Sequence, residues 1–398
     1  MTPKFTVQRE GGLRILAPLR PGDKVSSEMA AFYNPRTVPN RDIAVLCAAA
    51  YSRTQQQPVS VCDLLAATGV RGLRFLALDG VGAVYMNDVG RTPFQLMYRN
   101  LKLNYAPTSV NRNKGLVTCI VDGKSVRISN QEALTFLAEH KHSFHVLDLD
   151  PFGSPVAFIP SCIKSLRHGS MFCVTATDTA PLCGTYPSTC VRRYDALPFK
   201  TEYRHEIGLR ILTGYLVRRG CSVEVGMRPL FSHATAHYYR LYLAVKGSRR
   251  SADESLGEMG WALHCFKCGS RRPAHGFLPP QGVCCGAPMA VSGPLWVGPL
   301  KDEGFVRSMT DQMPFLEMGP EAAGIVSKVA QEADIFSFYD THQFSRMLGV
   351  PAPSTSKLMG AMRQLGFQAS PTHITGTGLK TDAPASEIVR CIRELSTG

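Results

Sequence analysis

An apolar run that ends in acidic residues, a proline and a glycine constrains the fold of this chain more than any other feature. The run is Phe144–Leu147, and Asp148–Pro155, which reads DLDPFGSP, follows it directly. A short β-rich run that stops at turn residues predicts a buried parallel strand. Because open α/β sheets bind ligands beyond the carboxyl ends of their strands, we expect Asp150 to lie in a cleft.

The turn at Asp150 is rich in hydrogen-bond acceptors. Pro151 has no backbone N–H and stiffens the turn, so the Asp150 carboxylate and the peptide oxygens are its polar groups, with the Phe152 ring beside them. Such a site suits a flat molecule that carries N–H groups, for example a nucleobase with an amino group. An Asp-Pro turn that begins the next helix explains these eight residues equally well.

Two strand-then-helix units precede that turn. Val59–Leu65 is predicted to be a strand that runs into the loop 66–72, whose small residues let the backbone approach a ligand at the start of a helix. The next predicted strand, Ala83–Met86, ends just before Asp88, where a carboxylate can accept both hydroxyls of a ribose. Since the loop lacks the G-x-G-x-x-G pattern, the sequence favours S-adenosyl-L-methionine over NAD.

A further acidic residue follows a third strand region. Gly115–Val121 and Val126–Ser129 are predicted to form a hairpin or an insertion, and Glu132 comes soon after them. Glu132 suits an acceptor for an adenine amino group, and it is explained equally well as the third residue of a helix capped by Ser129. Four acidic residues follow predicted strands in succession: Asp63, Asp88, Glu132 and Asp150. Together they predict a sheet whose carboxyl edge holds a nucleoside at its first strands and a second base at its fourth strand.

The segment before the first of these strands contributes further candidates. Asn40 is predicted as the N-cap of an apolar helix, Ile43–Tyr51. An arginine in the first turn opposes the helix dipole, so Arg41 is held there either for a ligand or for an acidic partner. From spacing alone, Phe32 is more consistent with a core residue than with a ligand contact.

The charge of the chain favours a polyanionic partner. The 398 residues include 44 Lys and Arg against 31 Asp and Glu, a formal charge of +13. Residues 192–250 hold twelve basic and four acidic residues, so this segment alone carries +8, with tyrosines interleaved among the charges. The candidates for phosphate contact are Arg192, Arg193, Lys200 and Arg204, each of which is also explained as solvated surface.

The cysteines indicate a reducing compartment. The 13 cysteines occur in a chain whose first residues are polar and lack a secretory apolar core, so we expect free thiols rather than disulfides. No apolar run approaches the length needed to span a membrane. The expected location is the cytoplasm, without a membrane partner or an obligate protein partner.

A second domain is predicted after a polar basic linker, 246–250, so the expected domains are 1–250 and 251–398. Within the second, Cys265 and Cys268 form a knuckle, and a zinc ribbon over 264–290 needs further ligands. Cys284 and Cys285 are candidates, but because adjacent cysteines bind one metal less easily, His264 or His275 is an alternative ligand. A zinc ion here would be structural.

The end of the chain is predicted to form a winged-helix-like module that helps to hold RNA. Helices are expected around Gln343–Leu348 and from Ser354 to Leu365, with Gly366 ending the second. The basic residues that could contact RNA there are Lys357, Arg363 and Lys380.

The chain resembles the tRNA guanine-N2 dimethyltransferases, which modify the guanine at position 26 of tRNA. The resemblance covers nearly the whole length, and the run through THITGTGLKTDAP is more specific to that family than the glycine loop is. The motifs are FYNP at 32–35, NRD at 40–42, AATGVRG at 66–72, NDV at 87–89, DLDPFGSP at 148–155, TATDTAPLCGT at 175–185, RRYDALPFKTEYRHEIGLRIL at 192–212, AHYYRLY at 236–242, SGPLWVGPL at 292–300 and PTHITGTGLKTDAP at 371–384.

The resemblance implies an α/β, Rossmann-like class I methyltransferase with a smaller α+β C-terminal domain, S-adenosyl-L-methionine as methyl donor and tRNA as substrate. It implies that Asp150 and Phe152 receive the guanine and that Phe32 packs near it. The family usually has Asp-Ala where Glu132-Ala133 stands, so that position is a departure. The implied cofactor-binding residues are Arg41, Asp63, Gly69, Arg71, Asp88, Glu132 and Ala133.

Two alternatives have a different chemistry. A DNA amino-methyltransferase shares the acidic-Pro-aromatic turn, but such enzymes usually carry a second aromatic residue or proline where Gly153 stands. An RNA-binding protein without catalytic activity, built from a zinc ribbon and a winged helix, would not require the acidic strand ends.

Overall fold

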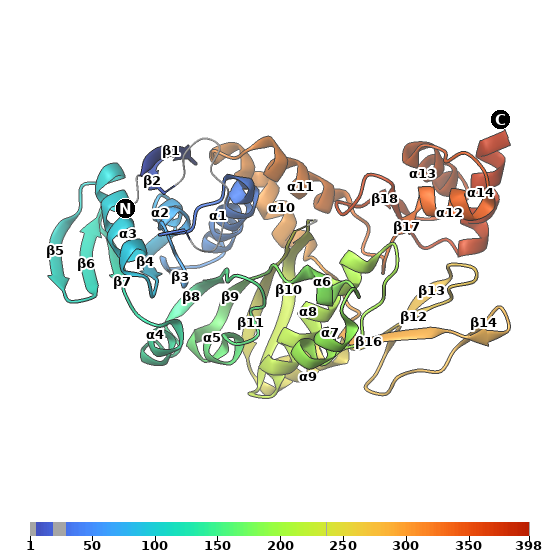
Figure 1. Ribbon diagram of the computed structural model, residues 1–398, viewed down its shortest axis with the longest axis horizontal. Helices are drawn as coiled ribbons and strands as arrows, with labels where there is room; N and C mark the ends of the chain where they lie inside the picture. Colours follow the sequence, from blue (N-terminus) through green and yellow to red (C-terminus); the bar gives the residue numbers. More distant parts are fainter. Residues whose placement is uncertain (1–4, 19–28, 236, 398) are drawn as a thin grey trace. The chain divides into compact units, whose positions relative to one another are not determined.

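The computed structural model describes residues 5–18, 29–235 and 237–397 (Figure 1). The chain forms two compact units that are interleaved along the sequence. The first unit takes in Met1–Ala176, Tyr242–Gly247 and Gly304–Val326, and the second takes in Thr177–Leu241, Ser248–Glu303 and Ser327–Gly398. The division into a methyltransferase domain, 1–250, and a C-terminal tRNA-binding domain, 251–398, stays a prediction.

The first unit is built on a sheet whose central strands are parallel. The strands of this sheet that lie wholly or partly in the first unit are β3 (Val59–Asp63), β4 (Val81–Asn87), β5 (Thr108–Asn113), β6 (Leu116–Val121), β7 (Lys124–Ser129), β8 (Phe144–Leu149), β9 (Leu166–Ala176) and β11 (Tyr239–Gly247). They lie in the order β11-β9-β8-β3-β4-β7-β6-β5, and the pairs from β9 to β7 are parallel. This parallel order, with helices in the connections, confirms the predicted Rossmann-like sheet.

The predicted hairpin is formed by β6 and β7, and β5 is a further strand that pairs with β6. β6 pairs antiparallel with both β5 and β7, and the tight turn at Asp122-Gly123 joins β6 to β7. Both turn residues have positive φ, 48° and 78°, a conformation that matches the twist of a two-residue hairpin. β6 and then β5 lie at the edge of the sheet, in the cyan part of Figure 1.

Apolar sequence explains why the central strands are buried. Val61, Val146 and Phe172, on three neighbouring strands, have no exposed surface. Strands that are buried on both faces require such near-continuous apolar runs. The other elements of these segments are β1 (Thr6–Glu10), β2 (Leu13–Ala17), η1 (Pro35–Thr37), α1 (Val38–Arg53), α2 (Val70–Leu76), α3 (Arg91–Asn104), α4 (Ala133–Glu139), α5 (Ile159–Ser165), α10 (Glu303–Gln312), η2 (Met313–Phe315) and α11 (Pro320–Gln331).

Helix α1 begins earlier than predicted, so the expected N-cap role of Asn40 is wrong. The residue that precedes the helix is Thr37, and Pro39 lies in the first turn. Proline suits that position because its missing N–H would have no partner inside the helix. Asn40 and Arg41 are therefore helical residues, and both are buried.

The second unit contains a long buried helix, α8 (Arg204–Cys221), which packs against β10 (Val225–Ala234) and β16 (Ala290–Trp296). α8 continues to Cys221, and β10 begins at Val225. β16 forms an antiparallel sheet with β12 (Met259–His264), and β13 (Arg271–His275) lies on the other side of β12. The other elements here are α6 (Thr179–Leu182), α7 (Pro187–Tyr194), α9 (Arg249–Gly257), β14 (Val283–Cys284) and β15 (Ala287–Pro288).

The predicted linker 246–250 is wrong. β11 continues to Gly247, and α9 begins two residues later at Arg249. Ser248 is the N-cap of α9, where its hydroxyl accepts a hydrogen bond from the Ser251 N–H at 3.2 Å. A Ser before a polar run is a helix-start signal, and the basic composition concealed it.

The C-terminal residues form a small module with its own core. Helices α12 (Thr341–Leu348), α13 (Thr355–Gln364) and α14 (Ala385–Thr397) pack with the strands β17 (Tyr339–Asp340), β18 (Ala369–Pro371) and β19 (Gly378–Thr381) (Figure 1). Both predicted helices are present: Ser354 caps α13, and Gly366, with φ +87°, follows its end. The winged-helix-like assignment stays a prediction. No helix among the described residues has the length and apolar character required to cross a bilayer.

Candidate functional site

The structure brings the carboxyl ends of four parallel strands together at one edge of the sheet. Asp63, the last residue of β3, lies opposite Asp148 on β8 and opposite Met86 on β4. Asn87, the last residue of β4, lies opposite Ser129 on β7. The acidic residues predicted at these strand ends therefore come from adjacent positions of one sheet edge, where open α/β sheets bind ligands.

Arg71 joins two of these carboxylates. From the first turn of α2, its Nη1 donates to Asp148 and its Nη2 donates to Asp150, and Nη2 also donates to Asn40 Oδ1 at 3.2 Å. Asp148 is buried, whereas the Asp150 side chain is 27% exposed. A planar guanidinium with several fixed donors suits this bridging position. Arg71 was predicted to bind the cofactor, and in the structure it holds the two carboxylates.

Asp63 is the most deeply buried of the predicted carboxylates. Its Oδ2 accepts a hydrogen bond from the backbone N–H of Gly72 at 3.0 Å. Burial raises the pKa of Asp63 to about 7, opposed by the Arg71 guanidinium and reinforced by the Asp148 charge. Gly72 is required here because a Cβ at this position would lie 2.4 Å from the Met86 side chain.

Asp88 is held by two backbone donors. Its Oδ2 accepts from the Ala67 N–H at 3.0 Å, and its Oδ1 accepts from the Gly90 N–H at 2.8 Å. Burial raises the pKa of Asp88, and the two backbone hydrogen bonds oppose that rise. The loop that supplies Ala67 ends at Gly69, which has a φ of +79° and directly precedes the first residue of α2. Loop and carboxylate thus fix each other's position.

Glu132 caps a helix, but in a different way from the one expected. It is the N-cap of α4 itself, and its Oε2 accepts from the Thr135 N–H at 2.9 Å. Hydrogen bonds from backbone N–H groups, first that of Leu134, lower the pKa of this exposed carboxyl. The N-cap role expected for Ser129 is wrong, because Ser129 is the last residue of β7. Ala133 is the buried first residue of α4.

Arg41 has an acidic partner that the sequence did not reveal. Its Nε and Nη2 donate to the two carboxylate oxygens of Glu10, each at 2.6 Å. Tyr33 also donates to Glu10, at 3.0 Å, and Arg74 pairs with it at 3.2 Å. Of the two roles left open for Arg41, the acidic partner is the one present in the structure. Glu10 lies 31 residues away in a short hairpin, and no spacing links the two.

Two aromatic rings lie beside the Asp150 turn. The ring centroids of Phe32 and Phe152 are 4.7 Å apart, and the rings meet edge to face at 89°. Phe152 is 59% exposed, and Phe32 is half-buried. Phe32 therefore contacts Phe152, the residue that is predicted to receive the guanine. Spacing alone had favoured a core position for Phe32.

Four cysteines converge in the second unit. The sulfur atoms of Cys265, Cys268, Cys284 and Cys285 all lie within 4.8 Å of one another, with Cys268 3.6 Å from Cys284. Tetrahedral zinc with Zn–S bonds of about 2.3 Å requires sulfurs roughly 3.8 Å apart, so the set fits zinc. Cys285 has φ +52°, and this backbone conformation lets adjacent cysteines point to one place.

The alternative histidine ligands lie elsewhere. His264 Nδ1 is 3.1 Å from the Tyr203 hydroxyl, and His275 Nδ1 is 3.1 Å from the Gly257 carbonyl oxygen. Neither histidine belongs to the group of possible metal ligands in the described part of the chain.

Some of the basic residues predicted to contact RNA bind other groups of the protein, and others do not. Arg193 pairs with Asp178 at 3.0 Å. Arg363 donates twice to the Ala369 carbonyl oxygen, so it links α13 to the start of β18. The RNA contact predicted for Lys380 is wrong: it is buried and pairs with Glu206 at 3.0 Å.

Arg192 donates to the Thr189 hydroxyl at 3.1 Å, and Lys200 and Arg204 line a cavity. Lys357 is exposed and its RNA contact stays a prediction.

The motif PTHITGTGLKTDAP supports the second unit from inside. His373 pairs with Glu332, and its Nε2 accepts from the Ala234 N–H at 3.0 Å. Lys380 donates to Glu206 and to the Ile335 carbonyl oxygen at 2.9 Å. Burial would raise the pKa of Glu206, but Lys380 and Arg210 outweigh it and lower the pKa to about 2. The polar motif is thus a set of buried contacts that sequence analysis missed.

The chain matches the family model described as N2,N2-dimethylguanosine tRNA methyltransferase over residues 11–393. The chain belongs to this family. It is similar to proteins named tRNA (guanine(26)-N(2))-dimethyltransferase from Methanothermobacter thermautotrophicus, with 36% identity over 95% of this chain and 96% of the relative, and from Methanobrevibacter smithii, with 34% identity over 94% of each.

A solved structure of this family has the same fold. It is Trm1 from Pyrococcus horikoshii in complex with S-adenosyl-L-methionine, which matches with a TM-score of 0.88 and 34% identity over 97% of this chain and 99% of that one. The predicted family and fold are therefore confirmed along nearly the whole chain.

Proposed function

We propose that this chain transfers methyl groups from S-adenosyl-L-methionine to the exocyclic N2 of guanine 26 in tRNA, up to two on one nitrogen. Family membership and the names of the relatives support this activity. One observation in the structure carries the proposal: Arg71 bridges Asp148 and Asp150 at the same sheet edge as Asp63 and Asp88. This is the carboxylate arrangement that a nucleoside and a second base require.

The residues at the strand ends suit S-adenosyl-L-methionine. Asp88 accepts one backbone N–H on each oxygen, and a carboxylate has about four lone-pair sites, so the two ribose hydroxyls can be accepted as well. Asp63 supplies an acidic group for the positively charged end of the ligand. When bound, the cofactor supplies an activated methyl group on a sulfonium. The other proposed contacts are Arg41, Gly69, Arg71, Glu132 and Ala133.

Asp150 is proposed to activate the guanine amino group. That nitrogen is a poor nucleophile because its lone pair is conjugated with the ring. Acceptors on its two N–H bonds favour a pyramidal nitrogen whose lone pair points at the methyl group. The Asp150 carboxylate and a peptide oxygen of the Asp150–Phe152 turn are those acceptors, and Arg71 fixes the carboxylate. The proton leaves late, so a strong base is unnecessary.

The target base must leave its stack to reach this turn. Phe152 is exposed and is buttressed edge-on by Phe32, so its face is available to a base. Stacking on an aromatic side chain contributes about 1–3 kcal/mol per base, which offsets part of the cost of extrusion. The two phenylalanines are therefore proposed to receive the guanine.

The four cysteines are proposed to hold a structural zinc ion in the second unit. Their sulfur geometry supports a closed four-thiolate shell, and closed shells of this kind stabilise folds. The methyl transfer requires no metal-activated water. The cytoplasm is the proposed location, because thiols stay reduced there.

The test is methyl transfer to unmodified tRNA. We expect labelled S-adenosyl-L-methionine to yield labelled dimethylguanosine after digestion of the tRNA to nucleosides, and no label with the same tRNA carrying adenine at position 26. Label in DNA alone would indicate an amino-group DNA methyltransferase. Binding of tRNA without any transfer would indicate an RNA-binding protein, and either result contradicts the proposal.

A further inference from the structure

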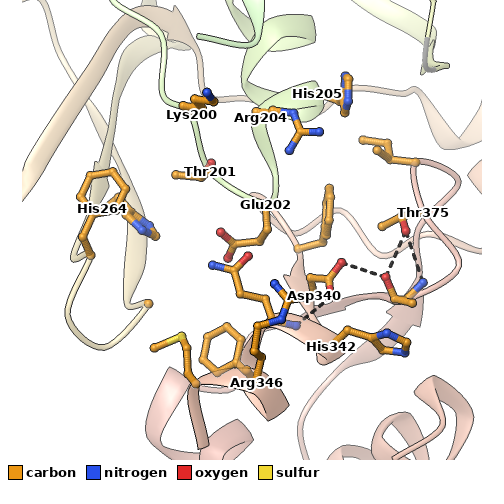
Figure 2. A pocket seen from close by; sticks show the side chains of 18 residues that line it. Lys200, Thr201, Glu202, Arg204, His205, His264, Asp340, His342, Arg346 and Thr375 are labelled. Carbon is orange, nitrogen blue, oxygen red and sulfur yellow. Dashed lines mark hydrogen bonds between the residues drawn. The ribbon is translucent and has the colours of Figure 1, made fainter. Parts of the chain in front are cut away.

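The second unit contains a cavity of about 740 Å³ that the proposed methyl transfer does not use (Figure 2). Its walls come from residues 200–205 before and at the start of α8, from residues 264–269 of the cysteine loop, and from α12. The volume lies within the range of about 300–1,000 Å³ that is usual for small-molecule sites. The cavity is therefore large enough for one nucleotide.

Three exposed cations line the cavity: Lys200, Arg204 and Arg346. Figure 2 shows Arg204 and Arg346 entering it from opposite sides. Among the residues that the structure describes, no carboxylate forms an ion pair with any of the three. This contrasts with Arg193 and Lys380, whose charges are paired with carboxylates.

The carboxylates of the lining are already occupied. Glu202 pairs with the buried Arg271 at 2.6 Å. Asp340 accepts from the Gln343 N–H at 3.1 Å and from the Thr377 hydroxyl at 2.8 Å, so it caps α12. Among the described residues, Asp340 is then the one lining carboxylate without an ion pair, against three cations, so the net charge of the cavity is positive and its preferred ligand is an anion.

An aromatic ring accompanies the cations. Phe266 lines the cavity and is 64% exposed, and its ring meets the His264 ring edge-on at 4.5 Å and 76°. An exposed aromatic face beside arginines is the arrangement that binds an unpaired nucleotide, with the base on the ring and the phosphate on the cations. A base-paired nucleotide offers no free base face, so a duplex does not satisfy both features.

We propose that this cavity binds one unpaired nucleotide of tRNA, with its phosphate on Arg204, Lys200 and Arg346 and its base on Phe266. The identity of the RNA rests on the proposed function. The site would hold the substrate in the second unit, whereas the residues proposed for methyl transfer belong to the first unit.

Binding of a single-stranded RNA hexamer and of the corresponding duplex tests the proposal. We expect Arg204→Ala and Arg346→Ala each to weaken hexamer binding about tenfold, to lower the slope of log K against log salt by about 0.7, and to leave duplex binding nearly unchanged. Arg250→Ala is the control, since the Arg250 side chain is 90% exposed and outside the cavity. Equal losses for hexamer and duplex, or no loss, would overturn the proposal.

The aromatic contact has its own test. Phe266→Ala should weaken hexamer binding by about 5- to 150-fold, the range for loss of one base–aromatic stack, and Phe266→Tyr should restore it. Thermal unfolding and bound zinc, measured for both variants, separate a lost stack from a disturbed cysteine loop. If a folded Phe266→Ala protein binds the hexamer as tightly as wild type, the proposed stacking of a base on Phe266 is wrong.

Methyl-transfer kinetics separate this proposal from the proposed function. We expect Arg204→Ala to raise KM for tRNA about tenfold while kcat and the Kd for S-adenosyl-L-methionine stay at wild-type values. If wild-type protein makes no dimethylguanosine but still prefers the hexamer to the duplex in an Arg204-dependent way, the function fails and the cavity assignment survives. Normal transfer with an unchanged KM in Arg204→Ala overturns the cavity assignment alone.

Discussion

Two clusters of buried charge, one in each unit, differ in their access to solvent. In the first unit, Arg71 bridges Asp148 and Asp150, and the Asp150 side chain is 27% exposed. In the second unit, Glu206 pairs with both Arg210 and Lys380, and the Glu206 side chain is 1% exposed. The first cluster presents a carboxylate to a ligand, whereas the second encloses every charge.

The difference teaches how to separate a binding cluster from a supporting one when both look alike in sequence. Burying ions is costly, and removal of one partner leaves an uncompensated charge. In the closed cluster, removal of one partner should lower the stability of the protein and change no ligand contact. In the open cluster the remaining pair can persist, so the consequence falls on whatever ligand Asp150 contacts.

The largest expected effect is on stability, in the closed cluster. Lys380→Met should lower the free energy of unfolding by about 3–5 kcal/mol, because Glu206 keeps a buried charge with one partner fewer. Chemical denaturation measures this. Lys357→Met, at an exposed lysine of the same module, is the matched control and should change stability by less than about 0.5 kcal/mol.

Adding Glu206→Gln to Lys380→Met sharpens the test. Each single substitution already removes the Lys380–Glu206 pair, so the loss in the double variant should be smaller than the sum of the two single losses. Additive losses would mean that the Lys380–Glu206 contact is not what stabilises this cluster, and the contrast between the two units would then disappear.

In the open cluster, Asp150→Ala should abolish function without unfolding the protein. We expect kcat to fall by about 10²–10³-fold or more, because the amino group loses a preorganised acceptor, while the Kd for S-adenosyl-L-methionine stays nearly unchanged. Single-turnover transfer and calorimetric cofactor binding measure the two quantities. Asp253→Ala, at an exposed position of α9, is the control. A large loss of cofactor binding in Asp150→Ala would contradict the proposed role.

The same contrast explains how far the sequence could be interpreted. The strand ends were predictable because an apolar run and the acidic residue that ends it are adjacent, and parallel strands bring those ends together. The partners of Arg41 and Lys380 were not predictable, since Glu10 and Glu206 lie 31 and 174 residues away. Ion pairs over such separations leave no periodic signal, and a basic residue in a polar motif therefore suggested an RNA contact.

The cysteine loop shows a second kind of limit. Adjacent cysteines were expected to bind one metal poorly, and a histidine was considered in their place. Their convergence depends on positive φ at Cys285 and at Gly286, 52° and 75°. Glycine signals that conformation in a sequence, but cysteine does not. The backbone conformation of these two residues thus brings the four sulfur atoms together.

A smaller effect is expected at the ribose position. Asp88→Ala should weaken S-adenosyl-L-methionine binding by about 10- to 100-fold, the usual range for hydrogen bonds to a charged group, with a smaller change in kcat at saturating cofactor. Asp79→Ala, at an exposed loop position of the same unit, should bind normally. Wild-type affinity in Asp88→Ala would remove the ribose assignment, even if Asp150 behaves as proposed.

The smallest effect is a pH dependence of opposite sign in the two units. The folded pKa of Asp63 is raised to about 7, so its stabilising contribution is complete below the unfolded pKa and is lost as the pH rises through about 7. The folded pKa of Glu206 is lowered to about 2, so its contribution is present above the unfolded pKa and is lost only in strong acid. Of these two carboxyl groups, only Asp63 should therefore titrate near neutral pH.

Between about pH 6 and pH 7, Asp63 should cost the folded protein about 1 kcal/mol, since one pKa unit corresponds to about 1.4 kcal/mol. Asp63→Asn keeps an acceptor for the Gly72 N–H and should flatten this part of the stability curve. Glu206→Gln should leave its slope unchanged. Denaturant midpoints measured between about pH 6 and pH 7 test this prediction. Equal slopes of stability against pH for wild type and Asp63→Asn would mean that Asp63 is ionised throughout this range and that Arg71 compensates its charge.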